Sequence, residues 1–113
     1  ALRFVSGYER LHRAVPDVDI IVATGGALLR SPAWMQIMAD ALATPFQASL
    51  EAEASCRGAA ILALESLGVL QNVSHAPTEL GRCYEPRQHI TARYTAARAR
   101  QEHAYRLVVD RQY

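Results

Sequence analysis

Two adjacent glycines, Gly25 and Gly26, are the residues of this chain best suited to contact a ligand. They follow a short apolar run, residues 20–23, which is typical of a strand covered on both faces in a parallel sheet. Because glycine has no Cβ, the main chain can turn sharply there and a ligand can approach the backbone closely. Ligands of open α/β sheets bind outside the carboxyl ends of the strands. The stretch therefore predicts either a ligand contact or a simple strand-to-helix turn.

Other side chains that could do chemistry lack partners of the right type and spacing. Glu51 and Glu53 form a pair of carboxylates, but no His or third acid accompanies them, so we expect both to be solvated. Asp40 lies within a predicted helix, where we expect a structural role. The four histidines and the two cysteines, Cys56 and Cys83, lack metal-ligand spacing, so no metal site made of protein ligands is expected. No catalytic residue is assigned.

Composition and charge limit the classes of protein to which the chain can belong. Its 113 residues suffice for one domain, and an apolar content of 50% is that of a folded chain. No apolar run approaches the ~20 residues of a membrane-spanning helix. The net charge of +1 gives no reason to expect a nucleic-acid or membrane-surface partner. The scarcity of cysteine favours reduced thiols and a cytoplasmic location.

Two common phosphate-binding motifs are absent. All basic residues are arginine, so the chain has no lysine for a Walker loop. The turn at Gly25 and Gly26 also lacks the third glycine of the dinucleotide-binding fingerprint.

The spacing of apolar residues indicates an α/β chain. Expected helices cover residues 2–15, 32–43, 56–67 and 86–110, and expected strands cover 19–24 and 46–49. Residues 72–82 have the composition of a loop. A strand, a helix and a second strand in that order imply a right-handed parallel crossover. The expected architecture is a parallel strand-helix-strand-helix unit with additional N-terminal and C-terminal helices.

Two of the expected helices have recognisable ends and faces. Ser31 can cap the helix that begins with Pro32, and the inward face of that helix is expected to carry Trp34, Ile37, Met38 and Ala41. Ser55 is the expected cap of the helix over 56–67, which Gly68 closes. The small residues of that helix, such as Gly58, predict a close approach to a neighbouring backbone.

An ordered set of residues spans residues 18–109: Thr24-Gly25-Gly26, Ser31, Trp34, Gln36, Ala39-Asp40, Pro45, Glu53, Gly58-Ala59-Ala60, Gly68, Glu85-Pro86 and Tyr94. This set resembles the C-terminal domain of FGGY-family carbohydrate kinases. Within that family, the stretches Gly-Gly-Ala-Leu-Leu-Arg-Ser-Pro-Ala-Trp and Glu-Ala-Ser-Cys-Arg-Gly-Ala-Ala are most similar to the gluconate kinase branch.

The resemblance implies a fold, an activity and a set of partners. Family members have two lobes of the ribonuclease H-like, actin-type ATPase fold, and they transfer the γ-phosphoryl group of ATP to a hydroxyl of a sugar, sugar acid or polyol. By position, the family's contacts to the adenosine and α-phosphate would fall on Gly25, Gly26 and Ala27, and a further nucleoside contact on Arg30. Magnesium would be bound through the nucleotide. The general base and most sugar contacts would lie in the N-terminal half.

The resemblance also implies that residues 1–113 are one segment, the C-terminal part of the C-terminal lobe of a longer two-lobed kinase. Such a segment is expected to be inactive alone and to expose an apolar sheet edge or face. Its expected partners are its own N-terminal lobe, ATP or ADP and a small carbohydrate, and a homodimer is one expected assembly. Gluconate is the favoured substrate, with xylulose, ribulose and glycerol open.

Two alternatives from other classes stay open at this point. One is a non-kinase domain of the actin-like ATPase superfamily that uses ATP for conformational work. The other is a partner-binding α/β domain without a nucleotide, in which Gly25 and Gly26 form only a turn.

Overall fold

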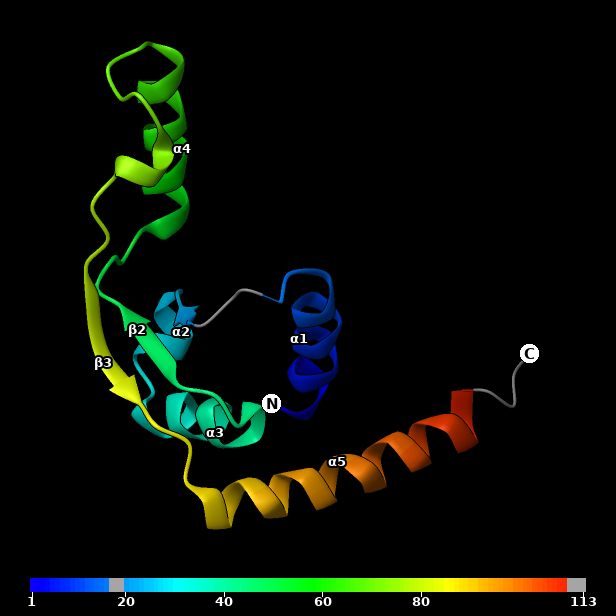
Figure 1. The fold of residues 1–113 in the computed structure, drawn as a ribbon. Coiled ribbons are helices and arrows are strands. Elements are labelled where there is room, and N and C mark those ends of the chain that lie inside the picture. Colours follow the sequence, from blue (N-terminus) through cyan, green and yellow to red (C-terminus); the bar gives the residue numbers. More distant parts are fainter. Residues whose placement is uncertain (17–19, 110–113) are drawn as a thin grey trace.

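The computed structural model describes residues 1–16 and 20–109 and has a mixed α/β fold (Figure 1). Its elements are, in chain order, α1 (Leu2–Ala14), β1 (Ile21–Ala23), α2 (Gly26–Leu29), α3 (Pro32–Leu42), β2 (Phe46–Ser49), α4 (Ala54–Ser66), the 3-10 helix η1 (Val73–His75), β3 (Leu80–Tyr84) and α5 (Gln88–Val109). The predicted starting point of the first strand, Asp19, and the predicted end of the last helix, Asp110, lie outside the described residues.

The three described strands form one sheet in the order β1-β2-β3. β1 and β2 are parallel, with Ile21 opposite Phe46, and α2 and α3 lie between them in the chain, which confirms the predicted parallel connection through a helix. β3 pairs antiparallel with β2, with an irregularity in register between Gln47 and Ser49. The prediction of a loop over residues 72–82 was wrong, because this stretch contains η1 and the start of β3. The stretch carries few apolar residues, so periodicity gives no sign of a strand there.

α3 lies at the centre of the molecule and begins as the sequence predicts. The backbone N–H of Trp34 donates to Oγ of Ser31 at 3.3 Å, and Pro32 occupies the first turn. Its buried face matches the predicted one only in part. Met38 is buried and Ala41 packs against the core, as predicted, but the other buried residues are Met35, Ala39 and Leu42, together with Asp40. Trp34 and Ile37 are instead 44% and 37% exposed.

The core lies between the sheet, α1 and α3. Its buried apolar residues are Val5, Ala23, Met35, Met38, Ala39, Leu42, Phe46 and Tyr84. α1 contributes Val5 to this core and packs Tyr8 against it, whereas Leu11, one turn later, is 68% exposed. The core is therefore small, and much apolar surface lies outside it.

α4 and η1 extend away from the sheet as an arm (Figure 1). α4 begins at Ala54 and its N-cap residue, Glu53, makes no side-chain cap, so the predicted cap at Ser55 was wrong. A Cβ built on Gly58 would meet no atom within 4 Å, so the predicted close approach to a neighbouring backbone is also wrong among the described residues. Gly68 follows the helix with a φ of +73°, as expected for a glycine that closes a helix.

A buried carboxylate fastens the start of α5 to α3. Asp40 is fully buried and accepts hydrogen bonds from the backbone N–H of Arg87 at 2.8 Å, from its guanidinium at 2.6 Å (Nη2) and from Gln36 at 3.1 Å. Gln36 also donates to the carbonyl of Glu85 at 2.8 Å. Burial by itself raises the pKa of Asp40, but the hydrogen bonds from Arg87 and Gln36 outweigh it and hold the pKa below its ordinary value. The predicted structural role of Asp40 is confirmed.

A second ion pair connects α1 with α5. Arg98 of α5 donates to both carboxylate oxygens of Glu9 in α1, at 2.6 Å for Nη2, and to Glu102 one turn later at 3.0 Å. The hydrogen bond from Arg98 lowers the pKa of Glu9. Both groups are partly solvated, so we expect a contribution of about 0.2–1 kcal/mol to stability.

Among the described residues, no helix has the length and apolar character needed to cross a membrane.

The Asp40 network predicts a pH-dependent loss of stability on the substitution Asp40→Asn. Folding lowers the pKa of Asp40. The contribution of the ionised Asp40 to the free energy of unfolding is therefore complete above the pKa of about 4 in the unfolded chain, and it is lost as the pH falls through the pKa in the folded protein. We expect Asp40→Asn to lower the free energy of unfolding by about 1–3 kcal/mol at pH 7, measured by urea denaturation, and by less at pH 3.

Glu53→Gln removes an exposed carboxylate and is the matched control, for which we expect little change at either pH. If Asp40→Asn lowered the free energy of unfolding by the same amount at pH 7 and pH 3, the stabilising role assigned to the charge of Asp40 would be contradicted.

Candidate functional site

The glycine turn lies directly after the carboxyl end of β1. Gly25 has φ +94° and ψ 129°, a conformation that side-chain-bearing residues rarely adopt, and a Cβ built on it would meet no atom within 4 Å. Gly26 begins α2, and a Cβ built there would lie 3.6 Å from Cζ of the Arg30 guanidinium. The backbone at Gly25 is therefore open to a ligand, while Arg30 lies beside Gly26.

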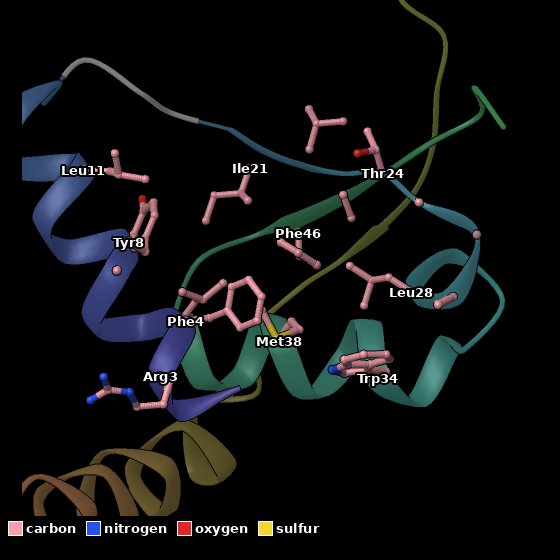
Figure 2. Close-up of a pocket in the computed structure, with 17 residues that line it drawn as sticks. Arg3, Phe4, Tyr8, Leu11, Ile21, Thr24, Leu28, Trp34, Met38 and Phe46 are labelled. Carbon is pink, nitrogen blue, oxygen red and sulfur yellow. The ribbon is translucent and has the colours of Figure 1, made fainter. Parts of the chain in front are cut away.

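The turn forms one end of an apolar groove between α1, β1 and α3 (Figure 2). The groove has a volume of about 830 Å³ and is lined by Arg3, Phe4, Gly7, Tyr8, Leu11, Ile21, Val22, Ala23, Thr24, Gly25, Gly26, Ala27, Leu28, Trp34, Met38, Leu42 and Phe46. Three of the four predicted site residues, Gly25, Gly26 and Ala27, thus lie together on this groove. Arg30 does not line it.

Aromatic side chains line the groove, and sequence reasoning did not assign them to a site. In Figure 2, Phe4 of α1 points toward Met38 of α3, and Trp34 lies on α3 near Leu28 of α2, at the end of the groove close to the glycine turn. Trp34 was expected in the core. The series Met35, Met38, Ala39 and Leu42 has the same helical spacing as the predicted inward series, offset by one residue, so spacing alone could not distinguish the two faces.

The lining of the groove is suited to binding a ligand, but it has few side chains that could act as acids or bases. Among the described residues, Arg3 is the one charged side chain in the lining of the groove, and its guanidinium lies 4.7 Å from the centre of the Tyr105 ring. Hydroxyl groups are supplied by Tyr8 and Thr24. In the part of the chain that the structure describes, no group of three or more His, Cys, Asp or Glu residues could hold a metal ion. Such a surface can bind a flat, largely apolar group beside an exposed main chain.

A smaller and more polar pocket, of about 370 Å³, lies at the carboxyl ends of β1 and β2. Its charged lining residues include Glu51 and Arg57, which form an ion pair at 3.1 Å, and Glu79. Glu51 is therefore paired rather than simply solvated, whereas Glu53 is exposed. The two carboxylates do not combine into an acid–base pair with a third group.

Comparison with known proteins identifies the family to which this chain is similar. Residues 1–67 match the family model of the C-terminal domain of the FGGY family of carbohydrate kinases. A curated relative, described as a probable L-xylulose kinase of Pasteurella multocida (strain Pm70), is 30% identical over 88 residues, which are 78% of this chain and 18% of that protein. The crystal structure of a ligand-bound xylulose kinase from Lactobacillus acidophilus matches 96% of this chain and 24% of that chain, with a TM-score of 0.72 and 20% identity.

The chain thus spans less than a quarter of the length of these two proteins. At 20% identity the structural match establishes a shared fold, and it confirms the α/β class that the sequence indicated. The family match covers more than half of the chain and includes the whole of the glycine turn and α3. The chain belongs to the FGGY family of carbohydrate kinases.

Proposed function

We propose that this chain is the nucleotide-binding part of an ATP-dependent carbohydrate kinase, which transfers the γ-phosphoryl group of ATP to a carbohydrate hydroxyl. The observation that carries the proposal is the position of Gly25 and Gly26. They lie inside the stretch that matches the family, at the carboxyl end of a parallel strand, and they border an open groove. Ligands of α/β sheets bind at this position.

In the proposed complex, the main chain at Gly25, Gly26 and Ala27 contacts the adenosine and the α-phosphate. The absence of a Cβ at Gly25, with open space above it, supports this close approach. The apolar and aromatic lining at the same end, including Trp34, suits a flat base. Arg30 does not line the groove, but its guanidinium lies next to Gly26, and it is the proposed further contact to the nucleoside.

The rest of the reaction depends on residues outside this chain. Phosphoryl transfer requires that two substrates and magnesium be positioned together, and the groove supplies one wall. Asp40, the most deeply buried acid in the described part of the chain, is already bound by Arg87 and Gln36. The general base, the sugar contacts and the second side of the nucleotide site would come from the N-terminal lobe, and magnesium would arrive with ATP.

The shape of the chain supports its place as the C-terminal part of the C-terminal lobe of a longer, two-lobed enzyme of the ribonuclease H-like, actin-type fold. Its radius of gyration is 17.5 Å, whereas a compact domain of this length has about 13 Å. We place the enzyme in the cytoplasm, since exposed free thiols such as Cys56 and Cys83 persist in a reducing compartment.

The substrate is one of a small set. Both proteins compared above are named as xylulose kinases, whereas the stretches from Gly25 to Trp34 and from Glu53 to Ala60 resemble gluconate kinases. Measuring ADP release by the full-length protein with MgATP and a panel of xylulose, gluconate, ribulose and glycerol distinguishes them. We expect turnover with one member of the panel. Tight ATP binding without turnover on any carbohydrate would favour a non-kinase ATPase instead.

The glycine turn makes a specific prediction for Gly26→Val. The new Cβ would lie at ordinary contact distance from Arg30, so the fold should persist, while the side chain covers main chain that the nucleotide approaches. We expect Gly26→Val in the full-length protein to weaken MgADP binding at least ~10-fold by calorimetry, a loss of about 1.4 kcal/mol.

Ala60→Val is the matched control, because Ala60 is an exposed residue of α4 and the substitution also adds a β-branched side chain to a helix. Equal nucleotide affinity in Gly26→Val and the native protein would mean that the two glycines form only a turn.

A further inference from the structure

The smaller polar pocket reaches the residue before the glycine turn from the face of β1 that points away from the core. Successive side chains of a strand alternate between its two faces, so Val22 and Thr24 lie opposite Ala23, which is buried in the core. In Figure 2 the side chain of Thr24 points away from Met38. Val22 and Thr24 line the polar pocket and also border the apolar groove. A ligand that crosses the end of β1 at the turn therefore has access to both cavities.

We propose that the polar pocket binds the vicinal hydroxyl groups of the nucleotide's ribose, with Glu51 as the contact residue and Arg57 as the residue that positions it. This inference rests on the proposed function, because it assigns a further part of the same nucleotide. The ribose would lie on the polar side of β1, and the base would lie on the apolar side near Trp34.

The first argument is the chemistry of the pocket lining. Thr24, Ser49 and Thr78 carry hydroxyl groups, whereas Glu51 and Glu79 carry carboxylates. A carboxylate accepts hydrogen bonds from hydroxyls, and an acidic side chain holds a ribose hydroxyl in this way in many dinucleotide-binding proteins. The lining has two carboxylates and one guanidinium, so its excess of negative charge disfavours a phosphate group. The uncharged ribose is therefore the part of ATP that suits this pocket.

The second argument is that Glu51 is held in place before a ligand arrives. Nε of Arg57 lies 3.1 Å from Oε2 of Glu51, and Nη2 of Arg57 donates to the carbonyl of Pro77. The backbone N–H of Glu51 donates to Oγ of the buried Ser49 at 3.0 Å. The ion pair uses Oε2, which leaves Oε1 as the acceptor for a ligand hydroxyl. The side chains of Arg57 and Glu51 are 33% and 40% exposed, so a ligand can still reach them.

The carbohydrate substrate is a second source of vicinal hydroxyl groups. The ribose is favoured because Thr24, in the pocket lining, directly precedes Gly25, to which the proposed function assigns the nucleotide. A ligand part that binds beside Thr24 must therefore be continuous with the group that contacts the turn.

The affinity of the full-length protein for MgADP and its deoxy analogues tests the proposal. We expect calorimetry to show that the native protein binds MgADP about 10-fold more tightly than 2′-deoxyADP or 3′-deoxyADP, because the analogue lacks a hydroxyl that the carboxylate accepts. In Glu51→Ala this ratio should fall close to 1, and in Glu51→Gln, which keeps a weaker acceptor, it should fall less. Both nucleotides are compared in the same variant, so a general loss of affinity cancels from the ratio.

Glu53→Ala is the matched control, because Glu53 is an exposed carboxylate that does not line the pocket, and it should keep the native ratio. Arg57→Gln should lower the ratio, and Arg57→Lys, which retains a cation for Glu51, should restore part of it. A native ratio in Arg57→Gln would overturn the positioning role.

Two results would overturn the ribose assignment. One is tight binding of MgADP by the native protein without discrimination against either deoxy analogue, which would leave the proposed function intact. The other is a raised KM for the carbohydrate in Glu51→Ala with an unchanged nucleotide ratio, which would assign the pocket to the carbohydrate instead. Absence of any MgADP binding by the native protein would overturn the proposed function together with this inference.

Discussion

The buried side of α3 holds the other elements of this chain in place. Met35, Ala39 and Leu42 are buried on it, and burying the side chain of Met35, which is 1% exposed, contributes about 1.5–3 kcal/mol. α3 contacts α1, α2, α5, β2 and β3. Next to the apolar residues, Asp40 binds the backbone and side chain of Arg87 and so sets where α5 begins. The same helix connects β1 to β2 and follows the glycine turn, so its packing also fixes the position of the candidate site.

Most of the architecture could be predicted because the local signals are strong. The Ser31 cap with Pro32 and the strand over 46–49 each have one dominant interpretation, and the structure agrees with both. The apolar run before Gly25 also forms a strand, but Val22 is 41% exposed, so the predicted cover on both faces is not found among the described residues. The inward face of α3 could not be predicted reliably, because Trp34 and Met35 each start a series at helical spacing. The choice between them depends on tertiary contacts that no local pattern contains.

Local sequence patterns also failed to predict β3 and the start of α4. β3 pairs with β2 through backbone hydrogen bonds, and its sequence has no apolar alternation that would mark it as a strand. The cap predicted at Ser55 was wrong because α4 begins at Ala54, two residues before the predicted start at Cys56, which is a normal uncertainty of helix ends. For the site, the glycine turn was found from sequence, whereas the aromatic lining from α1 required the fold. Family resemblance supplied the nucleotide assignment, which periodicity and composition could not.

We propose that the glycine turn of β1 forms one wall of a nucleotide site. The most direct test is an experimental structure of the full-length protein with ADP and Mg²⁺ bound. We expect adenosine against the main chain of residues 25–27, with Trp34 near the base and magnesium held by phosphates and residues outside this chain. A nucleotide bound elsewhere, with no ligand group in contact with Gly25 or Gly26, would contradict it.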